Sequence, residues 1–365
     1  MRKIDWYILK KLLVTFFFCM LLFTVIAVAI DTTEKSDDFV RANLSTGQII
    51  SQYYLGFVPW IWSLLFPLFV FIAVIFFTSQ LAARSEIIAI LSSGTSYNRF
   101  LRPYIIGGVL LGLLLWVGSR YWIPLANILR SNFQTIYIDK NDPTQNHSYT
   151  NCSNCFYLRT DTNTFVSIRD FDTSRKEARG FSMQRIKNNK VVYNIRAEMI
   201  RWDTATNKWQ LQNAVERTVD SMKETVKQYP TLTFALNLKP GELRKDEYLK
   251  DKLTTPQLIA FIRQEELRGT EGLNALKVER YRRTAASAAV LLLTMIGVVI
   301  SSRRSRGGSG VHLAIGILIA ALFIMSDRFS TVFAVKSNFP PLLAAWLPNI
   351  AFAGVAYWLY RRAPK

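Results

Sequence analysis

The sequence has little of what catalysis usually needs. Its 365 residues include only two histidines and three cysteines. It contains no G-x-x-x-x-G-K-[ST] phosphate loop, no H-E-x-x-H zinc motif and no G-x-S-x-G nucleophile turn. We therefore expect a protein that is not an enzyme and that holds neither a metal nor another cofactor. If the protein drives an uphill process, a separate subunit must hydrolyse the nucleotide.

Apolar residues, by contrast, make up half of the chain, although its formal net charge is +19. They gather in six long runs, at 12–30, 55–78, 104–122, 284–302, 311–335 and 342–360. About 20 helical residues cross a hydrocarbon core roughly 30 Å thick, so each run is long enough to span a membrane. The first run could also be a signal peptide, but it is longer than the apolar core of about 7–15 residues typical of one. We predict a membrane α-helical protein with six transmembrane helices, three on each side of an inserted domain.

Basic residues indicate the orientation of these helices, because short cytoplasmic loops are enriched in Lys and Arg. On one side of the six-span arrangement lie Arg2, Lys3, Lys10, Lys11, Arg84, Arg99, Arg102, Arg303, Arg304, Arg306, Arg361, Arg362 and Lys365. The short loops of the other side hold only Lys35, Arg41 and Lys336, among several acidic residues. We expect a multi-pass protein of the bacterial inner membrane with both termini in the cytoplasm.

The long stretch between the third and fourth runs has a different pattern. Residues 193–199 alternate apolar and polar side chains, the period of two expected of a strand with one buried face. A polar turn at 203–208 precedes a second alternating stretch, which predicts a hairpin, and residues 156–168 show the same arrangement. We predict a small β-sandwich or roll on the far side of the membrane.

Helical signals return before the fourth run. Thr255 and Pro256 suit the N-cap and first turn of a helix that ends near Gly269, and a second helix continues into the membrane. The expected domains are therefore 1–122 for the first three spans, with a cytoplasmic segment at 79–99, 123–254 for the β domain, 255–283 for connector helices and 284–365 for the last three spans.

Two of the cysteines fall in the segment predicted to face an oxidising compartment. A local disulfide between Cys152 and Cys155 is the first interpretation, and free thiols are the second. A metal site with His147 is a third, although structural zinc usually takes four ligands and only three are in view.

Ionisable residues near a membrane often mark function. Asp327 and Arg328 lie about 24 Å along the fifth span from Val311, at 1.5 Å per residue, and therefore near its outer boundary. Arg328 is a candidate contact for the phosphate of an anionic head group, through charge-assisted hydrogen bonds. The alternative is a pair of side chains that only stabilises helix contacts.

The segment between the second and third spans has a helix-like pattern over 79–91 and ends at Ser92-Ser93-Gly94. Glu86 is an isolated acid among loops that are otherwise basic, and Arg84 and Ser85 precede it. Glu86 could meet a basic groove on a cytoplasmic partner. A plain amphipathic connector would show a similar pattern.

Several short motifs, in this order along the whole chain, resemble the YjgP/YjgQ family of permeases, the LptF and LptG subunits of the lipopolysaccharide exporter. They are Ile4-Asp5-Trp6-Tyr7, 85–94, 254–258, Gly310-Val311-His312, Asn338-Phe339-Pro340-Pro341 and Leu347-Pro348-Asn349. The last two are more similar to LptG than to LptF.

The resemblance implies the partners of the protein. It implies a half-transporter that pairs with a second, LptF-like permease chain and binds a separate cytoplasmic ATPase dimer, LptB-like, through Glu86 with Arg84 and Ser85 beside it. Such a complex extracts lipopolysaccharide from the outer leaflet of the inner membrane. It passes the lipid to a periplasmic bridge that includes a membrane-anchored, LptC-like protein, and no nucleic acid is involved.

The resemblance also implies a β-jelly-roll-like inserted domain and a lateral gate between the first and fifth spans. Val28 and Phe329 are the candidate gate residues. The candidate head-group residues are Lys35, Arg41, His312 and Arg328.

Two departures from the family concern the head-group site and the fourth span. The segment 31–38 is mainly acidic where LptG relatives can carry lysines, and residues 284–286 lack the proline often found at the start of the fourth span. Two other classes stay open. One is the transmembrane subunit of another ABC-type lipid or lipoprotein release system, although those chains place the extracytoplasmic domain after the first of four spans. The other is a membrane scaffold with no transport role.

Overall fold

The computed structural model describes residues 3–138, 156–161, 163–172, 175–187, 190–204, 206–220, 223–236, 238, 240, 248–268, 272–303, 309–337 and 339–362. The chain divides into two compact units. A helical unit comprises residues 1–140, 250–259 and 274–365, and a second unit comprises residues 141–249 and 260–273. The candidate disulfide, Cys152 and Cys155, lies outside the described residues.

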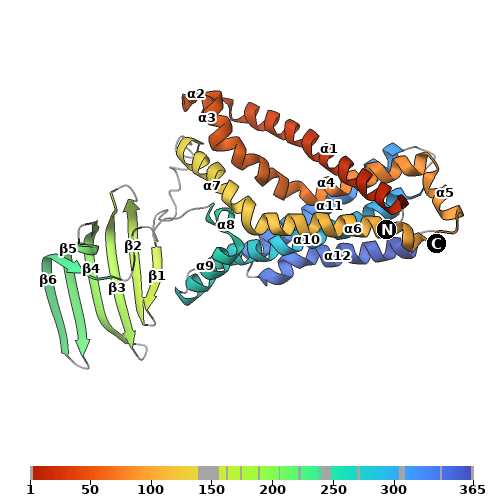
Figure 1. Ribbon diagram of the computed structural model, residues 1–365. Helices are drawn as coiled ribbons and strands as arrows, with labels where there is room; N and C mark the ends of the chain where they lie inside the picture. Colours follow the sequence, from red (N-terminus) through yellow and green to blue (C-terminus); the bar gives the residue numbers. More distant parts are fainter. Residues whose placement is uncertain are drawn as a thin grey trace. The chain divides into compact units, whose positions relative to one another are not determined.

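Six helical stretches in the described ranges are long and apolar enough to cross a membrane. They are Lys3–Glu34, Thr46–Ala83, Tyr97–Ile138, Leu273–Ser301, Gly310–Lys336 and Pro341–Arg361. The prediction of six spans in a three-plus-three order is confirmed. The two termini lie at the same end of the helical unit as the short helix α5, Glu86–Ser92 (Figure 1).

Several spans are built from consecutive helical pieces. The first half contains α1 (Lys3–Glu34), α2 (Ser36–Arg41), α3 (Thr46–Ile49), the π-helix η1 (Ile50–Tyr54), α4 (Leu55–Ala83), α6 (Tyr97–Val117), η2 (Gly118–Trp122), α7 (Ile123–Phe133) and η3 (Gln134–Ile138). The second half contains α8 (Leu249–Lys252), α9 (Thr255–Arg268), α10 (Leu273–Ser301), α11 (Ser309–Lys336) and α12 (Pro341–Arg361).

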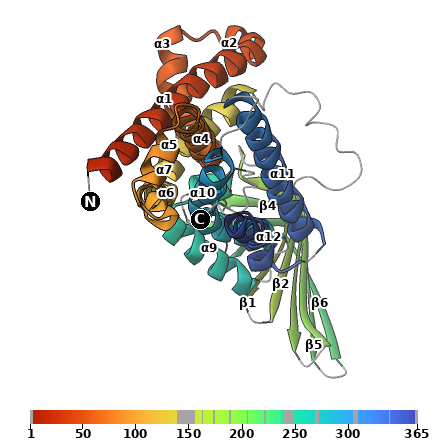
Figure 2. The ribbon, with the colours of Figure 1, turned by 90° about the vertical axis from the view of Figure 1, so that its right-hand side faces the viewer.

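The helix α4 is the centre of the helical unit. It packs against α1, α7 and α11, and Figure 2 shows α1 and α11 on opposite sides of it. In the C-terminal half of α4, from Phe66 to Ala82, most residues on every side of the helix are buried, as expected of a helix enclosed by other helices. Pro59 and Pro67 lie inside it, which membrane helices tolerate because neighbouring groups satisfy the freed backbone.

The third span is longer than predicted. We expected the β domain to begin at residue 123, but helical structure continues through α7 and η3 to Ile138, and α7 packs against α4. The described strands begin at Phe156. The polar side chains of α7 obscured this extension in the sequence, because they lower its hydropathy although they are buried against other helices.

Gly56 allows α4 and α7 to approach closely. A Cβ atom built on Gly56 would lie 2.5 Å from the carbonyl oxygen of Ala126 and 2.6 Å from the amide nitrogen of Arg130, so the backbones would have to separate. We predict that Gly56→Ala destabilises the protein by about 1–3 kcal/mol through overpacking. Thermal unfolding in detergent measures this effect. Gly354→Ala in α12 is the matched control, because nothing lies within 4 Å of its added Cβ, and equal melting of the two variants would contradict the close approach.

The second unit is an all-β domain. Its described strands are β1 (Phe156–Asp161), β2 (Thr164–Asp172), β3 (Glu177–Lys187), β4 (Lys190–Asp203), β5 (Lys208–Asp220) and β6 (Lys223–Phe234). They form one antiparallel sheet in which each strand pairs with the next along the chain. The predicted hairpin at 203–208 is confirmed, since Asp203 pairs with Lys208. The inserted β domain is therefore confirmed, with the strand order of a meander.

One face of this sheet forms the core of the β domain. Buried side chains recur at alternate positions of the central strands, such as Met183, Ile195 and Leu211. The segment after β6 covers this face, because Leu238 is buried there and its carbonyl oxygen accepts a hydrogen bond of 2.7 Å from Trp209 Nε1. The alternation seen in the sequence thus reports a sheet with one apolar face.

Candidate functional sites

The segment between α4 and α5 presents an acid at one end of the helical unit. Ser85 breaks the two helices apart, because its φ of 60° is left-handed and cannot continue an α-helix. Glu86 begins α5, where a carboxylate interacts favourably with the helix dipole. Among the described side chains, none forms a hydrogen bond or ion pair with Glu86.

The same helix is anchored on one face and open on the other. Ile87 is 2% exposed and belongs to the main core of the helical unit, whereas Ile88 is 53% exposed. Arg84 is exposed and Ser85 is half-buried. The segment therefore offers a partly exposed carboxylate next to an exposed apolar side chain, on a helix that its own core holds in place.

The first head-group candidate, Lys35, is already paired within the chain. Its Nζ lies 2.7 Å from Asp31 Oδ1 and 4.6 Å from the centre of the Tyr53 ring, and it also donates to the Tyr53 hydroxyl. The Tyr53 hydroxyl donates to Asp31 at 3.0 Å. Asp31 is 6% exposed, so Lys35 neutralises a buried charge at the end of α1.

We predict that Lys35 is structural. Lys35→Met should cost roughly 3–5 kcal/mol, because it leaves the buried Asp31 carboxylate without its partner. The double variant Asp31→Asn/Lys35→Met should recover most of that loss. Thermal unfolding of both variants measures this, and a Lys35→Met protein as stable as the parent would show instead that Lys35 is free for a ligand.

The other sequence candidates are widely separated. Arg41 is exposed in the last turn of α2. His312 is 7% exposed, and neither ring nitrogen has a hydrogen-bond partner among the described residues. Sixteen residues of α11 separate it from Arg328, which is about 24 Å. The structure therefore does not bring His312 and Arg328 into one head-group site.

The two gate candidates lie on helices that both pack against α4. Val28 on α1 packs beside an aromatic cluster that includes Phe39, Tyr53 and Phe57. Phe329 on α11 is 60% exposed. An exposed side chain on this membrane helix is available to lipid or to another protein.

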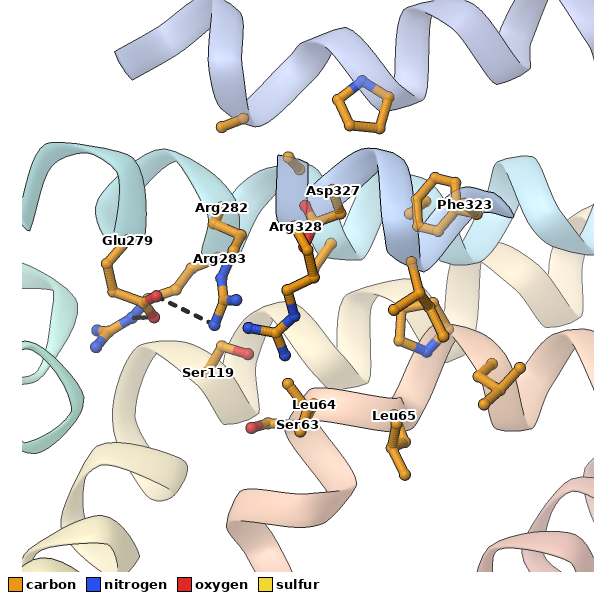
Figure 3. Close-up of a pocket in the computed structure, with 18 of the residues that line it drawn as sticks. Ser63, Leu64, Leu65, Ser119, Glu279, Arg282, Arg283, Phe323, Asp327 and Arg328 are labelled. Carbon is orange, nitrogen blue, oxygen red and sulfur yellow. Dashed lines mark hydrogen bonds and ion pairs between the residues drawn. The ribbon is translucent and has the colours of Figure 1, made fainter. Parts of the chain in front are cut away.

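A cavity of about 160 Å³, lined mainly by apolar residues but also by six charged ones, lies between α4, α7, α10, α11 and α12 (Figure 3). Its charged lining residues are Arg282, Arg283, Arg328, Asp251, Glu279 and Asp327. Three positive and three negative side chains therefore face one space. Leu64, Leu65 and Phe323 belong to its apolar part.

Two of the arginines are engaged within the chain. Arg282 lies 3.2 Å and Arg283 lies 3.3 Å from the Glu279 carboxylate. Arg283 also donates to the backbone oxygens of Lys250 and Leu253, at 2.8 and 3.0 Å. These bonds join the start of the fourth span to the segment around α8.

Arg328 differs from these arginines. It is exposed, and none of the described side chains forms a hydrogen bond or an ion pair with it. In Figure 3 its side chain extends from α11 toward Ser63 and Leu64 of α4. Arg328, which the sequence analysis singled out, thus carries a guanidinium group that lines the cavity.

Sequence reasoning missed most of this cavity. Arg130 is buried beside the lining and not in it, 4.1 Å from the centre of the Trp60 ring and 3.9 Å from Asp251, which both line the cavity. Burial, with the nearby Glu279 charge as a smaller cause, raises the pKa of the Asp251 carboxyl above its ordinary value. Besides Asp327 and Arg328, the sequence offered one further signal, the pair Arg282-Arg283 directly before an apolar run.

In the parts of the chain that are described, no group of three or more His, Cys, Asp or Glu residues is arranged so that it could hold a metal ion. Among known families, the model described as lipopolysaccharide export system permease LptF/LptG matches residues 6–362. The match includes all six spans, the β domain, Glu86 and the residues that line the cavity. No curated protein matches the chain significantly.

Proposed function

Because the chain belongs to the LptF/LptG family of lipopolysaccharide export permeases, we propose that it is one of two permease chains of an ATP-driven exporter in the bacterial inner membrane. The observation that carries this proposal is the family match over almost the whole chain, together with six apolar helices interrupted after the third by a β domain. The protein is a multi-pass transporter component and not a classical enzyme.

In the proposed orientation, both termini and α5 face the cytoplasm. The short basic flanks support this, because their Lys and Arg lie on one side of the six spans. Glu86 would enter a basic groove of a separate, LptB-like ATPase dimer, with Arg84 and Ser85 beside it. The anchored Ile87 would let movement of the ATPase pass into the core around α4.

On the opposite side, lipopolysaccharide would enter from the outer leaflet along α1 and α11, past Val28 and Phe329. Arg328 is the strongest of the four head-group candidates, because its guanidinium lines a cavity and forms no ion pair with a described side chain, whereas Lys35 is bound to Asp31. We propose that the exposed Arg41 adds a positive charge to the head-group site. His312 lies too far along α11 from Arg328 to contact the same head group. The β domain would pass the lipid to an LptC-like protein and a jelly-roll bridge.

Purification of the chain from native membranes tests the assembly. We expect a separate ATPase, an LptF-like second permease and an LptC-like bridge protein to co-purify. An ATPase together with a lipoprotein carrier would favour the lipoprotein-release alternative, and the absence of any ATPase would favour the scaffold. The LptG-like character of 338–341 and 347–349 makes an LptF-like partner the expected one.

A further inference from the structure

Two arginines lie directly opposite each other on the neighbouring strands β2 and β3 of the β domain (Figure 1). Arg169 pairs with Arg179 in the register of the sheet, and both side chains are exposed. The pairs on either side of them are core residues, Ile168 with Phe181 and Phe171 with Ala178. The two arginines therefore extend from the outer face of the sheet, the face opposite the core. Like charges directly opposite each other destabilise a sheet, so this pair needs an explanation.

The backbone is irregular at this pair. The register shifts on both sides of Arg169, and two residues at these shifts have a left-handed backbone, Asp170 with a φ of 47° and Gly180 with a φ of 72°. Such bulges increase the local twist and re-aim side chains. The stem of Arg169 lies across Gly180, where an added Cβ atom would come within 3.4–3.7 Å of it. Neither the bulges nor the opposed charges are needed to bury the core, so both indicate a role for the outer face.

Two serines and a third arginine lie on the same face. Ser167 pairs with Ser182 across β2 and β3, and Arg196 of β4 lies opposite Ser182. Paired positions share a face of the sheet, and all three residues alternate with buried core residues on their strands. The serines are half-buried and Arg196 is exposed. We call Ser167, Arg169, Arg179, Ser182 and Arg196 the arginine face.

The positive charge of the arginine face is not neutralised within the described residues. No side chain of its five residues forms a hydrogen bond or an ion pair there. Acids of the surrounding strands are bound elsewhere, Glu177 by Arg201 at 2.8 Å, Glu198 by Asn213 at 2.8 Å and Glu224 by Arg217 at 2.9 Å. Over residues 156–234, Lys and Arg outnumber Asp and Glu by 14 to 9. The face therefore attracts an anion.

The arrangement of donors fits a phosphate group. Guanidinium groups bind phosphate oxygens through charge-assisted hydrogen bonds, and serine hydroxyls can donate to the remaining oxygens. The Cα atoms of opposite residues are about 5 Å apart, so two guanidinium groups can reach one anion. An acidic protein fits less well, because protein interfaces centre on large side chains in packed pockets. Serines occupy the centre here, and the exposed Phe165 and Val215 lie at its edges.

We propose that the arginine face binds a phosphate group of lipopolysaccharide as the lipid passes through the β domain. The inference rests on the proposed function, which supplies a phosphorylated glycolipid. It adds a second phosphate contact to that of Arg328, in a separate compact unit. A bound phosphate would also remove the repulsion between Arg169 and Arg179.

The test uses the full chain in complex with its native partners, with Arg328→Gln in every sample so that the membrane cavity contributes little. The probe is a fluorescent, deacylated lipopolysaccharide that keeps its phosphates, and fluorescence anisotropy measures its affinity. Arg169→Gln/Arg179→Gln should weaken binding about 10–100-fold, because a charge-assisted hydrogen bond is lost. Removal of the phosphates from the probe should weaken binding to the parent by a similar factor and should not weaken binding to the variant further.

Arg201→Gln/Arg217→Gln is the matched control. It removes two charges from the same sheet, but from arginines that are bound to Glu177 and Glu224. This variant should bind the probe like the parent. Equal weakening by the two double variants would show a general attraction to a basic domain and would overturn the proposal. Unchanged binding in the first double variant would also overturn it.

Stability separates a ligand contact from a structural one. Arg169→Gln/Arg179→Gln removes a repulsion, so it should raise the melting temperature of the ligand-free complex. Glutamine keeps the stem atoms that lie across Gly180. A gain in stability together with a loss of binding is expected of residues retained for function. A lower melting temperature would show that the two arginines hold the sheet together and would overturn the proposal.

Two further outcomes separate this inference from its alternatives. Displacement of the probe by phosphatidylglycerol vesicles, lost in Arg169→Gln/Arg179→Gln, would show a membrane contact instead and would overturn the proposal. The proposed function is tested separately by photocrosslinking intact lipopolysaccharide from position 329, which does not involve the arginine face. Capture at 329 together with unchanged probe binding in the double variant would overturn this inference alone, whereas no capture at 329 would contradict the proposed function.

Discussion

Glu86→Arg is expected to weaken association with the ATPase by about 10²–10³-fold, because it places a positive charge against a basic groove. Juxtaposed like charges in an interface cost several kcal/mol, and each 1.4 kcal/mol is a factor of ten. Glu86 has no partner among the described side chains, so the substitution breaks no ion pair within those parts of the chain. Lipopolysaccharide export should fall with the association.

The measurement is co-purification of the ATPase, followed by its ATP hydrolysis rate in proteoliposomes. Asp37→Arg is the matched control, since Asp37 is another acid in the first turn of a short helix, α2, but lies at the other membrane boundary in the proposed topology. Glu86→Gln should give an intermediate effect, because it removes the charge without reversing it. Wild-type association of Glu86→Arg would show that α5 is a plain connector.

Arg328→Gln is expected to reduce lipopolysaccharide binding by about 10–100-fold. A hydrogen bond to a charged group contributes about 1.5–3 kcal/mol, and no other unpaired cation lines the described part of the cavity. Arg328→Lys should retain part of the binding, because a lysine keeps the charge but not the planar pair of donors.

Binding of fluorescent lipopolysaccharide to the purified complex measures this effect. Lys336→Gln is the control, since Lys336 is an exposed cation in the last turn of the same helix and does not line the cavity. Equal losses in both variants would indicate a general surface-charge effect. A loss confined to Arg328 would indicate a specific contact.

The sequence predicts those parts of the fold that depend on whether a side chain meets water, lipid or a protein core. Runs of about 20 apolar residues need lipid, and alternation over 193–199 needs a sheet with one buried face, so spans and hairpins follow from local patterns. Glu86 and Arg328 were also detectable in the sequence. Glu86 is an acid among basic loops, and Arg328 is a cation within an apolar run.

The remaining features depend on packing between segments far apart in the sequence. Asn127 and Asn349 line one cavity only because α7 and α12 both border it, and no local pattern marks either residue. The pairing of Lys35 is different. Asp31 lies one helical turn before it, and the spacing alone indicates an ion pair, so its assignment as a free head-group contact overlooked a local signal.

The most direct test of transport is photocrosslinking from position 329 in the complete complex, reconstituted with lipopolysaccharide. Phe329 is 60% exposed on α11 near Arg328, and the control position is Tyr357, which is 64% exposed on α12 near the opposite end of the helical unit. We predict that a crosslinker at 329 captures lipopolysaccharide, that ATP reduces the captured amount as the lipid moves on, and that position 357 captures none. Crosslinks from 329 to protein alone, unchanged by ATP, would contradict the assignment of this chain as the permease.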